Sequence, residues 1–469
     1  MACLNPGPMQ GYDTMVPADV PEIIEFEVSG KKYWWDPNIL ALYDTPEKPN
    51  PYKPVVRGYP GGRVGMIVLQ ATLKCNLACA YCFQREHEFI SGTMSFDVAQ
   101  RSVMSVTGNQ PKNLSVCFFG GEPLLNWELI EKVVEWLEPQ GGKFGVTTNG
   151  VLLTEERVKF LSKHKFSMIL SLDGPRELNK MRVMGAGEES YDRVIAALEI
   201  VKREAPDLAS RTTLRGTFDD RGVIRLVERL AFLNALCDDG YASGVAVEPA
   251  VSSESPCRAM GKQDGNMREK ACEEELARIE AEYEAARVWY IDRIKNGLKP
   301  RYQHFYKTLE RLVGRQVALC ECGSAKGYFS INVGGAIHAC HHLQNTYVGH
   351  VDKGGIDPEL QQPWLENRRY NRPLCKPCKF RNSCGGGCRE ESITMMGDIR
   401  VPSVRECMYK DIFFRNCVAI VGELGAEKLN GVLKLRCGCG DGPAMPSMKA
   451  RNALRSKWVG LMGDGDDAE

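Results

Sequence analysis

The chain has 469 residues, of which 43% are hydrophobic, and its 60 Lys and Arg residues are balanced by 60 Asp and Glu residues. This composition is that of an ordinary globular protein, long enough for one large domain or for two to three smaller ones. Its short, mixed charge tracts argue against a nucleic-acid surface. No apolar run approaches the ~20 residues of a membrane helix.

The N-terminal twenty residues contain no basic stretch followed by an apolar core, so no secretion signal is visible and we expect a cytoplasmic protein. The chain nevertheless contains 19 cysteines. Disulfide frameworks are rare in a reducing compartment, and the cysteines cluster along the chain. Metal binding or catalysis is therefore the better explanation for them.

Residues 1–60 are predicted to form a small N-terminal region. Short β-prone runs in 22–45, on either side of Ser29 and Gly30, predict a hairpin. The proline-rich stretch 46–54 is typical of a linker.

Residues 61–250 alternate between strand-like and helix-like patterns. Strands are predicted at 64–71, 114–119, 143–148, 166–172, 212–218 and 244–249, with amphipathic helical segments between them. Six such alternations predict an α/β fold with a parallel sheet, a partial (β/α)6 barrel of the TIM type. Such barrels carry their chemistry at the carboxyl ends of the strands.

The remainder of the chain is predicted as three parts. Residues 251–319 form a helical bridge, which contains an amphipathic helix over 268–296. Residues 320–420 contain many cysteines and glycines with little periodicity, as expected of a small domain that is organised by metal rather than by a core. Residues 421–469 form a C-terminal tail with Cys437 and Cys439, for which we expect weak order.

The first cysteine motif follows the first predicted strand. Cys75, Cys79 and Cys82 have the spacing C-x3-C-x2-C, one ligand short of a closed four-cysteine site. Three thiolates suit an iron–sulfur cluster or zinc. A structural zinc site, however, requires four ligands, and a catalytic zinc usually takes histidine or carboxylate ligands.

This motif resembles that of radical S-adenosylmethionine (SAM) enzymes. The resemblance implies a [4Fe–4S] cluster on Cys75, Cys79 and Cys82 whose fourth iron binds SAM. It also implies that an electron from the cluster cleaves SAM to a 5′-deoxyadenosyl radical, which abstracts hydrogen from a substrate.

The resemblance extends over roughly residues 64–248. Tyr81 and Phe83 flank the last cysteine as the family's aromatic residues do, FFGGEP (118–123) resembles its second-strand motif, and SLDG (171–174) resembles its fourth-strand motif. By this resemblance, the SAM-binding residues would be Gly120, Gly121 and Glu122 at the amino group, Ser171 at the ribose or carboxylate, and Tyr81.

Two charged residues lie at the ends of the fifth and sixth predicted strands. Arg215, in RGTF (215–218), can pair with a carboxylate of SAM or of the substrate, and Glu248, in VEP (247–249), can line the substrate side. We predict these two as the catalytic residues. Cys117, on a strand-like run, is predicted to be a core residue rather than a ligand.

Seven of the downstream cysteines form a second pattern, four of them in the block C-x2-C-x5-C-x3-C over 375–388: Cys322, Cys340, Cys375, Cys378, Cys384, Cys388 and Cys407. Their order resembles that of the SPASM domain of radical SAM enzymes that modify peptides and proteins. The resemblance implies two auxiliary [4Fe–4S] clusters, three in all with the first. One cluster would be held by Cys322, Cys340 and Cys388 with Cys320 as its fourth ligand, and the other by Cys375, Cys378, Cys384 and Cys407. A purely structural pair of zinc ribbons is the alternative.

The whole arrangement is most similar to the SCIFF or ranthipeptide maturases, which form thioether bridges in ribosomally made peptides. FFGGEPLLNW, LSLDG, RGTF followed by VEP, and CHH (340–342) are the specific points. The resemblance implies a cysteine-containing precursor peptide as substrate, gripped in part by strand addition at the N-terminal hairpin. It also implies a reductant such as ferredoxin or flavodoxin, and no nucleic-acid or membrane partner.

Other functions stay open at this point. Anaerobic sulfatase-maturing enzymes form formylglycine and usually have an aspartate where this chain has His341. Carbon–carbon cross-linking is another chemistry of the same family. From a different class, a non-catalytic iron–sulfur protein would transfer electrons or bind a partner without cleaving SAM.

Overall fold

The structure is a computed structural model of the whole chain. It describes residues 24–28, 30–36, 41–43, 55–57, 64–85, 92–185, 187–218, 224–250, 265–314, 316–318, 322–342, 346–367, 372–375 and 378–434. The predicted ligand Cys320 and the tail cysteines Cys437 and Cys439 lie outside these ranges.

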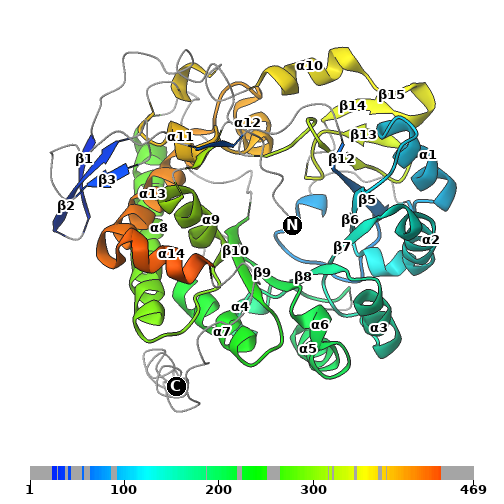
Figure 1. Cartoon of the computed structure of the whole chain (residues 1–469), viewed down its shortest axis with the longest axis horizontal. Helices are drawn as coiled ribbons and strands as arrows, with labels where there is room; N and C mark the ends of the chain where they lie inside the picture. Colours follow the sequence, from blue (N-terminus) through cyan, green and yellow to red (C-terminus); the bar gives the residue numbers. More distant parts are fainter. Residues whose placement is uncertain are drawn as a thin grey trace.

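Six parallel strands form the centre of the molecule, as the sequence predicts. They are β5 (Met66–Thr72), β6 (Ser115–Gly120), β7 (Lys143–Thr148), β8 (Ser167–Ser171), β9 (Thr212–Phe218) and β10 (Gly244–Pro249). Each strand pairs in parallel with the next one along the chain, so the strands lie in sequence order along an arc (Figure 1). This is the predicted α/β fold with a parallel sheet.

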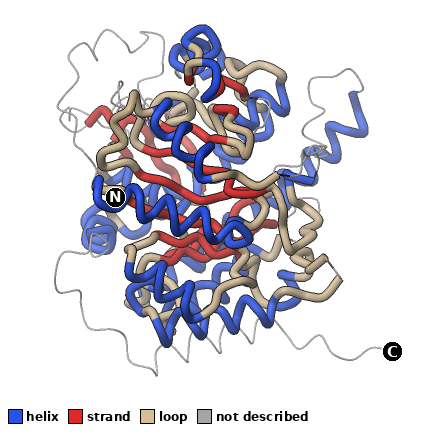
Figure 2. The backbone as a smooth tube through the Cα atoms, turned by 90° about the vertical axis from the view of Figure 1, so that its right-hand side faces the viewer, coloured by secondary structure: helices blue, strands red, loops and turns tan. Residues whose placement is uncertain are grey.

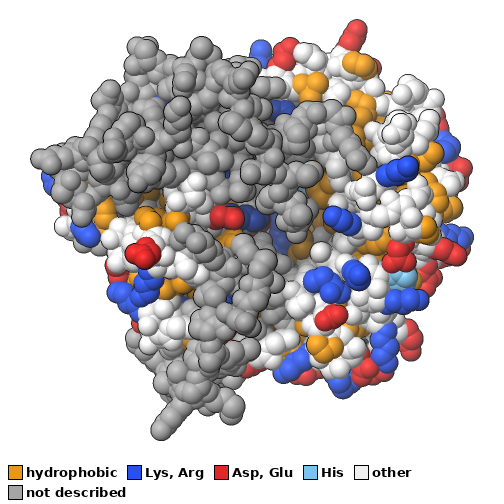
Figure 3. Space-filling view, viewed as in Figure 1, with side chains coloured by type: hydrophobic (Ala, Val, Ile, Leu, Met, Phe, Trp, Pro, Cys, Tyr) orange, Lys and Arg blue, Asp and Glu red, His pale blue; other side chains and the backbone are white. Residues whose placement is uncertain are grey.

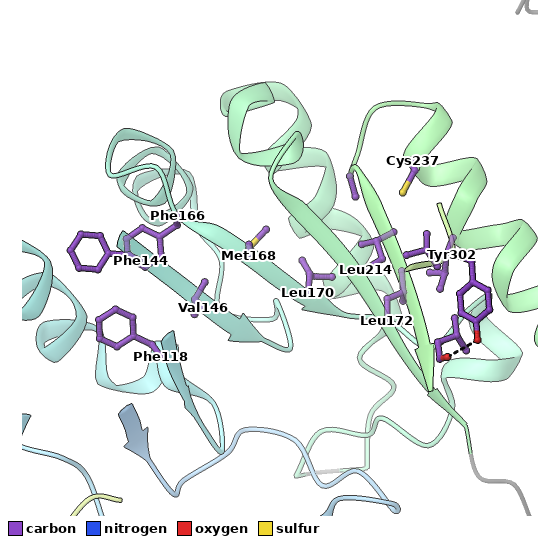
Figure 4. Close-up of a cluster of buried hydrophobic side chains, with 14 of the residues drawn as sticks. Phe118, Phe144, Val146, Phe166, Met168, Leu170, Leu172, Leu214, Cys237 and Tyr302 are labelled. Atoms are coloured by element: carbon purple, nitrogen blue, oxygen red, sulfur yellow. Dashed lines mark hydrogen bonds between the residues drawn. The ribbon is translucent and has the colours of Figure 1, made fainter. Parts of the chain in front are cut away.

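Helices cover the outside of this sheet (Figures 1 and 2). They are α1 (Phe96–Val106), α2 (Trp127–Leu137), α3 (Glu155–Lys163), α4 (Arg176–Asn179), α5 (Tyr191–Glu204), α6 (Pro206–Ala209) and α7 (Leu226–Asp238). Their apolar faces bury Phe118, Phe144 and Phe166, whose rings stack in the core (Figure 4). At the far end of this core, the Tyr302 hydroxyl donates to the Val247 carbonyl at 3.3 Å. The other strand face, which carries the polar side chains, is turned inward.

The sheet continues into the second cysteine region. Strand β12 (Tyr328–Ile331) pairs in parallel with β5, and the short antiparallel strands β13 (Ala336–His338), β14 (Tyr347–His350) and β15 (Gly355–Ile356) follow it. The sequence suggested little regular structure here, because strands of two to four residues are too short to show a period.

The remaining helices join the barrel to the cysteine-rich part. They are α8 (Gly265–Lys295), α9 (Gln303–Val313), α10 (Pro358–Glu366), α11 (Arg381–Cys384), α12 (Arg389–Met396), α13 (Val404–Leu424) and α14 (Ala426–Lys434). Helix α8 confirms the long helix predicted for 268–296, which it covers except for the last residue. Helix α13 packs against α8 and α9, and its end and α14 occupy the start of the region predicted as a tail.

The N-terminal region forms its own small sheet. The predicted hairpin is present as β1 (Ile24–Val28) and β2 (Lys31–Asp36), joined at Gly30 with φ +74°, and β3 (Ala41–Tyr43) adds a third strand. The Trp35 indole N–H donates to the Lys379 carbonyl at 3.0 Å and so attaches this sheet to the second cysteine region. The isolated strands β4 (Val55–Arg57) and β11 (Gln316–Ala318) pair in parallel.

The described surface mixes acidic and basic side chains (Figure 3). Among the described helices, none has both the length and the apolar character needed to cross a membrane.

Candidate functional site

The first cysteine loop leaves the carboxyl end of β5 and is held by backbone hydrogen bonds. Ala78 N donates to the Val183 carbonyl at 2.7 Å, and Ala80 N donates to the Met181 carbonyl at 3.1 Å. The loop and the segment 181–183 therefore support one another. Cys75, Cys79 and Cys82 all line one cavity, at the strand end where barrels of this type carry their chemistry.

The end of β6 packs so closely against the start of this loop that no side chain fits at Gly120 or Gly121. A Cβ atom on Gly120 would lie 2.1 Å from the Thr72 carbonyl oxygen, and one on Gly121 would lie 2.2 Å from that of Lys74. Gly121 N donates to Thr72 O at 2.8 Å. The two glycines are thus required for contact with the backbone that leads into Cys75, and both line the cavity.

Glu122 is fully buried, and its side chain is used by the protein itself. Its Oε1 accepts from the Thr148 hydroxyl at 2.7 Å, and its Oε2 accepts from Asn149 N at 2.8 Å. Burial raises the pKa of this carboxyl to about 7, although these hydrogen bonds lower it. Glu122 is not among the residues that line the cavity, so its predicted contact with SAM stays a prediction while its link to β7 is observed.

A buried network behind Tyr81 was not predicted from the sequence. The Tyr81 hydroxyl donates to Asp173 at 2.5 Å, Arg182 Nε lies 2.9 Å from Asp173 Oδ1, and Thr217 N donates to the same oxygen at 2.9 Å. Asp173 belongs to the quoted SLDG stretch, but its partners come from segments that are distant in sequence. The network fixes the cysteine loop to the ends of β8 and β9, and Tyr81 and Arg182 line the cavity.

The predicted pair Arg215 and Glu248 meets in the same cavity. Arg215 is ion-paired with Glu248, and His304 Nε2, from the first turn of α9, lies 3.2 Å from the other Glu248 oxygen. Burial raises the pKa of Glu248, but Arg215 and His304 outweigh it and lower the pKa well below the usual range. Glu248 is therefore an anion at neutral pH. Ser171 also lines the cavity.

Five described cysteines of the second region have sulfur neighbours: Cys407 lies near Cys375 and Cys378, and Cys388 lies near Cys322. Burial in first place, and the nearby Glu406, Cys375 and Cys378 after it, together raise the pKa of the Cys407 thiol to about 12. The pKa of Cys388 is raised well above its usual value by burial and by Glu406 and, in smaller part, by Cys322. These neighbours agree with the predicted ligand sets, which stay predictions.

Glu406 and Arg389 organise the backbone and the thiols of these groups. Both Glu406 carboxylate oxygens accept from Cys388 N, at 2.7 and 2.8 Å, and a Cβ on Gly387 would lie 2.5 Å from this carboxylate. Arg389 Nη1 donates to Cys322 Sγ at 3.5 Å.

A single cavity of about 1060 Å³ joins the first cysteine loop to the second region. From Cys75 it extends past Arg215 and Glu248 to Cys388 and to the acidic and basic side chains Glu390 and Arg405. It is lined at one end by residues of the barrel and at the other by α12 and α13.

The donor set of the first loop fits a metal cluster. Among the described residues, no group of three or more His, Cys, Asp or Glu side chains is already arranged to hold a metal ion. Cys75 is open to the cavity, but the surrounding walls desolvate its thiol and raise the pKa to about 11, and Glu122, Cys79 and Cys82 add to this effect. Three neighbouring thiols of this kind ionise readily only when a cation is bound to them.

Comparison with known proteins agrees with this site. Residues 69–230 match the family model of the Radical SAM superfamily. The chain is 29% identical over 178 residues to the radical SAM cyclopropyl synthase TigE of Paramaledivibacter caminithermalis, a match that covers 34% of this chain and only 37% of TigE. It is 25% identical over 356 residues to a cysteine-type anaerobic sulfatase-maturating enzyme of Clostridium perfringens, covering 70% of this chain and 89% of that enzyme.

Solved structures show the same fold. The structure of anSMEcpe with bound AdoMet superimposes with a TM-score of 0.62 at 20% identity, over 80% of this chain and 98% of that one. The chain thus carries a radical SAM domain and is related to sulfatase-maturating and TigE-type radical SAM enzymes. SAM and a [4Fe–4S] cluster are the cofactors that this relationship implies.

Proposed function

We propose that the protein is a radical SAM maturase that joins a cysteine sulfur to a carbon of a ribosomally made peptide in a thioether bond. The observation that carries the proposal is the continuous cavity from the first cysteine loop to Cys388. Its volume of about 1060 Å³ is at the upper end of that of small-molecule sites, and leaves space for a peptide beside a cofactor. Structures of the related anSMEcpe include one with bound AdoMet and a Cp18Cys peptide.

In this proposal, Cys75, Cys79 and Cys82 hold a cluster, and Gly120, Gly121, Ser171 and Tyr81 bound the SAM site. When bound, SAM and the cluster supply the removal of a hydrogen atom from a substrate carbon. Closing the C–S bond also removes a proton from the peptide thiol and releases one electron, which the iron–sulfur centres accept. Arg215 and Glu248 position the substrate, because a carboxylate that stays an anion beside Arg215 orients a ligand better than it accepts a proton.

The second cysteine region would hold two auxiliary clusters on the predicted ligands. Cys322, Cys340 and Cys388, with Cys320, would form one set, and Cys375, Cys378, Cys384 and Cys407 the other. The N-terminal sheet would bind part of the precursor peptide, and a ferredoxin or flavodoxin would supply electrons. The division into regions 1–60, 61–250, 251–319, 320–420 and 421–469 belongs to the same proposal.

Iron content and SAM cleavage test the proposal first. Three [4Fe–4S] clusters bring about twelve irons per chain, and a Cys75/Cys79/Cys82→Ala triple variant should retain about eight. The variant should also lose formation of 5′-deoxyadenosine from SAM under reduction. Zinc in place of iron, or cleavage that is unaffected by the variant, would contradict the proposal.

Formylglycine formation is the second candidate, favoured by the 89% coverage of the sulfatase-maturating enzyme. The two reactions differ in the fate of sulfur. A thioether keeps the cysteine sulfur and lowers the peptide mass by two hydrogen atoms, whereas formylglycine formation from cysteine releases the sulfur. Mass spectrometry of a cysteine-containing precursor peptide co-expressed with the protein decides between them.

A further inference from the structure

Asn149, directly after β7, has a side chain that the neighbouring backbone holds in one orientation. Its Oδ1 accepts from Val151 N at 3.0 Å, and its own backbone N donates to Glu122 Oε2 at 2.8 Å. Asn149 lines the cavity and is only 7% exposed. Because Val151 holds the amide oxygen, the amide nitrogen points away from Val151, and it meets the first cysteine loop.

The amide nitrogen of Asn149 donates twice to this loop. Nδ2 donates to Asn76 Oδ1 at 2.8 Å and to Cys75 Sγ at 3.9 Å. Asn76 follows Cys75 in the chain, so the shorter bond anchors the amide beside the sulfur. Leu77 N donates to the same sulfur at 3.4 Å. Cys75 Sγ therefore accepts from two N–H groups, one of its own loop and one of a side chain at a different strand end.

Negative charge on Cys75 is costly in these surroundings. Burial raises the pKa of its thiol, Glu122, Cys79 and Cys82 raise it as well, and the hydrogen bond from Leu77 lowers it, which leaves the pKa at about 11. A bound cluster makes the sulfur a thiolate, and an electron added to the cluster increases the negative charge on its sulfur ligands. An N–H donor stabilises that charge. Hydrogen bonds to the ligand sulfurs are accordingly among the factors that set the reduction potential of an iron–sulfur centre.

We propose that Asn149 is a positioning residue that raises the reduction potential of the first cluster by donating from its amide to the Cys75 sulfur. The inference rests on the proposed function in taking Cys75, Cys79 and Cys82 as cluster ligands, and adds the side chain that makes this cluster easier to reduce. The step concerned is the transfer of one electron from the external reductant to the cluster, which precedes SAM cleavage. No bond of Asn149 forms or breaks in it.

Two variants remove the donor in different ways. Asn149→Leu replaces the amide with an apolar side chain of similar size. Asn149→Asp keeps an oxygen for Val151 N but lacks both N–H bonds. Asn296→Asp is the control with the same change of side chain, because Asn296 is exposed in the turn after α8 and its amide donates to the Asp292 carbonyl at 2.8 Å.

A redox titration of the anaerobically reconstituted protein, followed by electron paramagnetic resonance, measures the effect. Subtracting the spectrum of the Cys75/Cys79/Cys82→Ala variant isolates the signal of the first cluster. The equilibrium constant for its one-electron reduction should fall about fivefold in both Asn149 variants, the contribution of one net hydrogen bond, which lowers the potential by about 41 mV. It should stay within about twofold of the wild-type value in Asn296→Asp. Iron content should be equal in the wild type and the three single variants.

The same samples separate this inference from the proposed function. An unchanged potential in an Asn149 variant that retains the first cluster would overturn the inference alone. Loss of this cluster from both Asn149 variants would also overturn it, because Asn149 would then only support the fold of the loop. A wild type that matches the Cys75/Cys79/Cys82→Ala variant in iron content and signal would contradict the proposed function, and the inference with it.

Discussion

At the scale of single residues, Glu122 shows how a motif residue can serve the scaffold around a cofactor site. Its carboxylate connects the end of β6 to Thr148 and Asn149 at the end of β7. Burial makes the ionised form costly, so the folded protein holds this proton to a higher pH than the unfolded chain does.

This gives a pH-dependent prediction. The folded-state pKa of about 7 lies above the ordinary value of 4.5 for a glutamate. The stability that comes from the neutral carboxyl is therefore present at low pH and is lost as the pH rises through about 7. Between about pH 5.5 and pH 8, the free energy of unfolding of the wild type should fall by about 2 kcal/mol relative to Glu122→Gln. Urea denaturation under anaerobic conditions measures this, and parallel pH profiles for the two proteins would refute it.

Glu248 carries a second prediction at this scale. Glu248→Gln removes the anion between Arg215 and His304, so the substrate should lose its orientation while the cysteine loop remains intact. We expect peptide modification to fall about tenfold, since a hydrogen bond to a charged group contributes about 1.5–3 kcal/mol and a factor of ten represents about 1.4 kcal/mol. Iron content should be unchanged. Glu128→Gln, on the exposed face of α2, is the control.

The candidate site was predictable from the sequence only where ligands follow one another closely. Cys75, Cys79 and Cys82 fall within one short loop, and their spacing alone indicates the chemistry. Asp173 and His304 were missed because their partners lie far away in the sequence: Arg229 donates to the Asp173 carbonyl from α7, and His304 reaches Glu248 from α9. No spacing rule connects such pairs.

At the scale of elements, Gly120 and Gly121 allow the end of β6 to pack directly on the backbone that follows β5. Gly121→Ala would place a Cβ 2.2 Å from the Lys74 carbonyl oxygen, which is backbone and cannot move aside without moving Cys75. We expect a loss of stability of about 3 kcal/mol or more and a loss of iron from the first cluster. Gly431→Ala in α14, where a Cβ would meet open space, should retain both, as measured by thermal unfolding and iron analysis.

The sequence predicted the strands of the barrel but not those of the second cysteine region. All six barrel strands were expected close to their observed bounds, because each has apolar residues at consecutive or alternate positions and lies between helical patterns. The strands β12–β15 were not expected. Only β12 pairs with β5, which is far away in the sequence, and β13 to β15 extend the sheet from β12. The local patterns of these short strands do not indicate this pairing.

At the scale of the whole molecule, a buried ion network holds the bridge helix α8 to the cysteine-rich region. Arg405 on α13 lies 3.7 Å from Glu275 on α8 and 3.3 Å from Glu391 on α12. Tyr409 donates to the same Glu275 at 2.8 Å. These side chains close the far end of the cavity.

Removing the arginine from this network tests its contribution. Arg405→Met removes the cation that the buried Glu275 and Glu391 share and should lower the free energy of unfolding by about 3–5 kcal/mol. Arg415 lies on the same helix α13 and pairs with Glu280 and Asp411, which are more exposed. Arg415→Met should therefore lower the free energy of unfolding by less than about 1 kcal/mol. Urea denaturation of the two variants measures both, and equal losses would contradict a special role for Arg405.

The pairing of β12 with β5 also affects how the chain folds during its synthesis. Strand β5 is synthesised early, and β6 soon covers one of its edges, but the other edge pairs with Tyr328–Ile331, more than half a chain length later. Until then, the apolar segment Met66–Thr72 presents open backbone groups to any other strand. The cysteine-rich region therefore acts as a late cover against aggregation of the nascent barrel, besides any part it takes in chemistry.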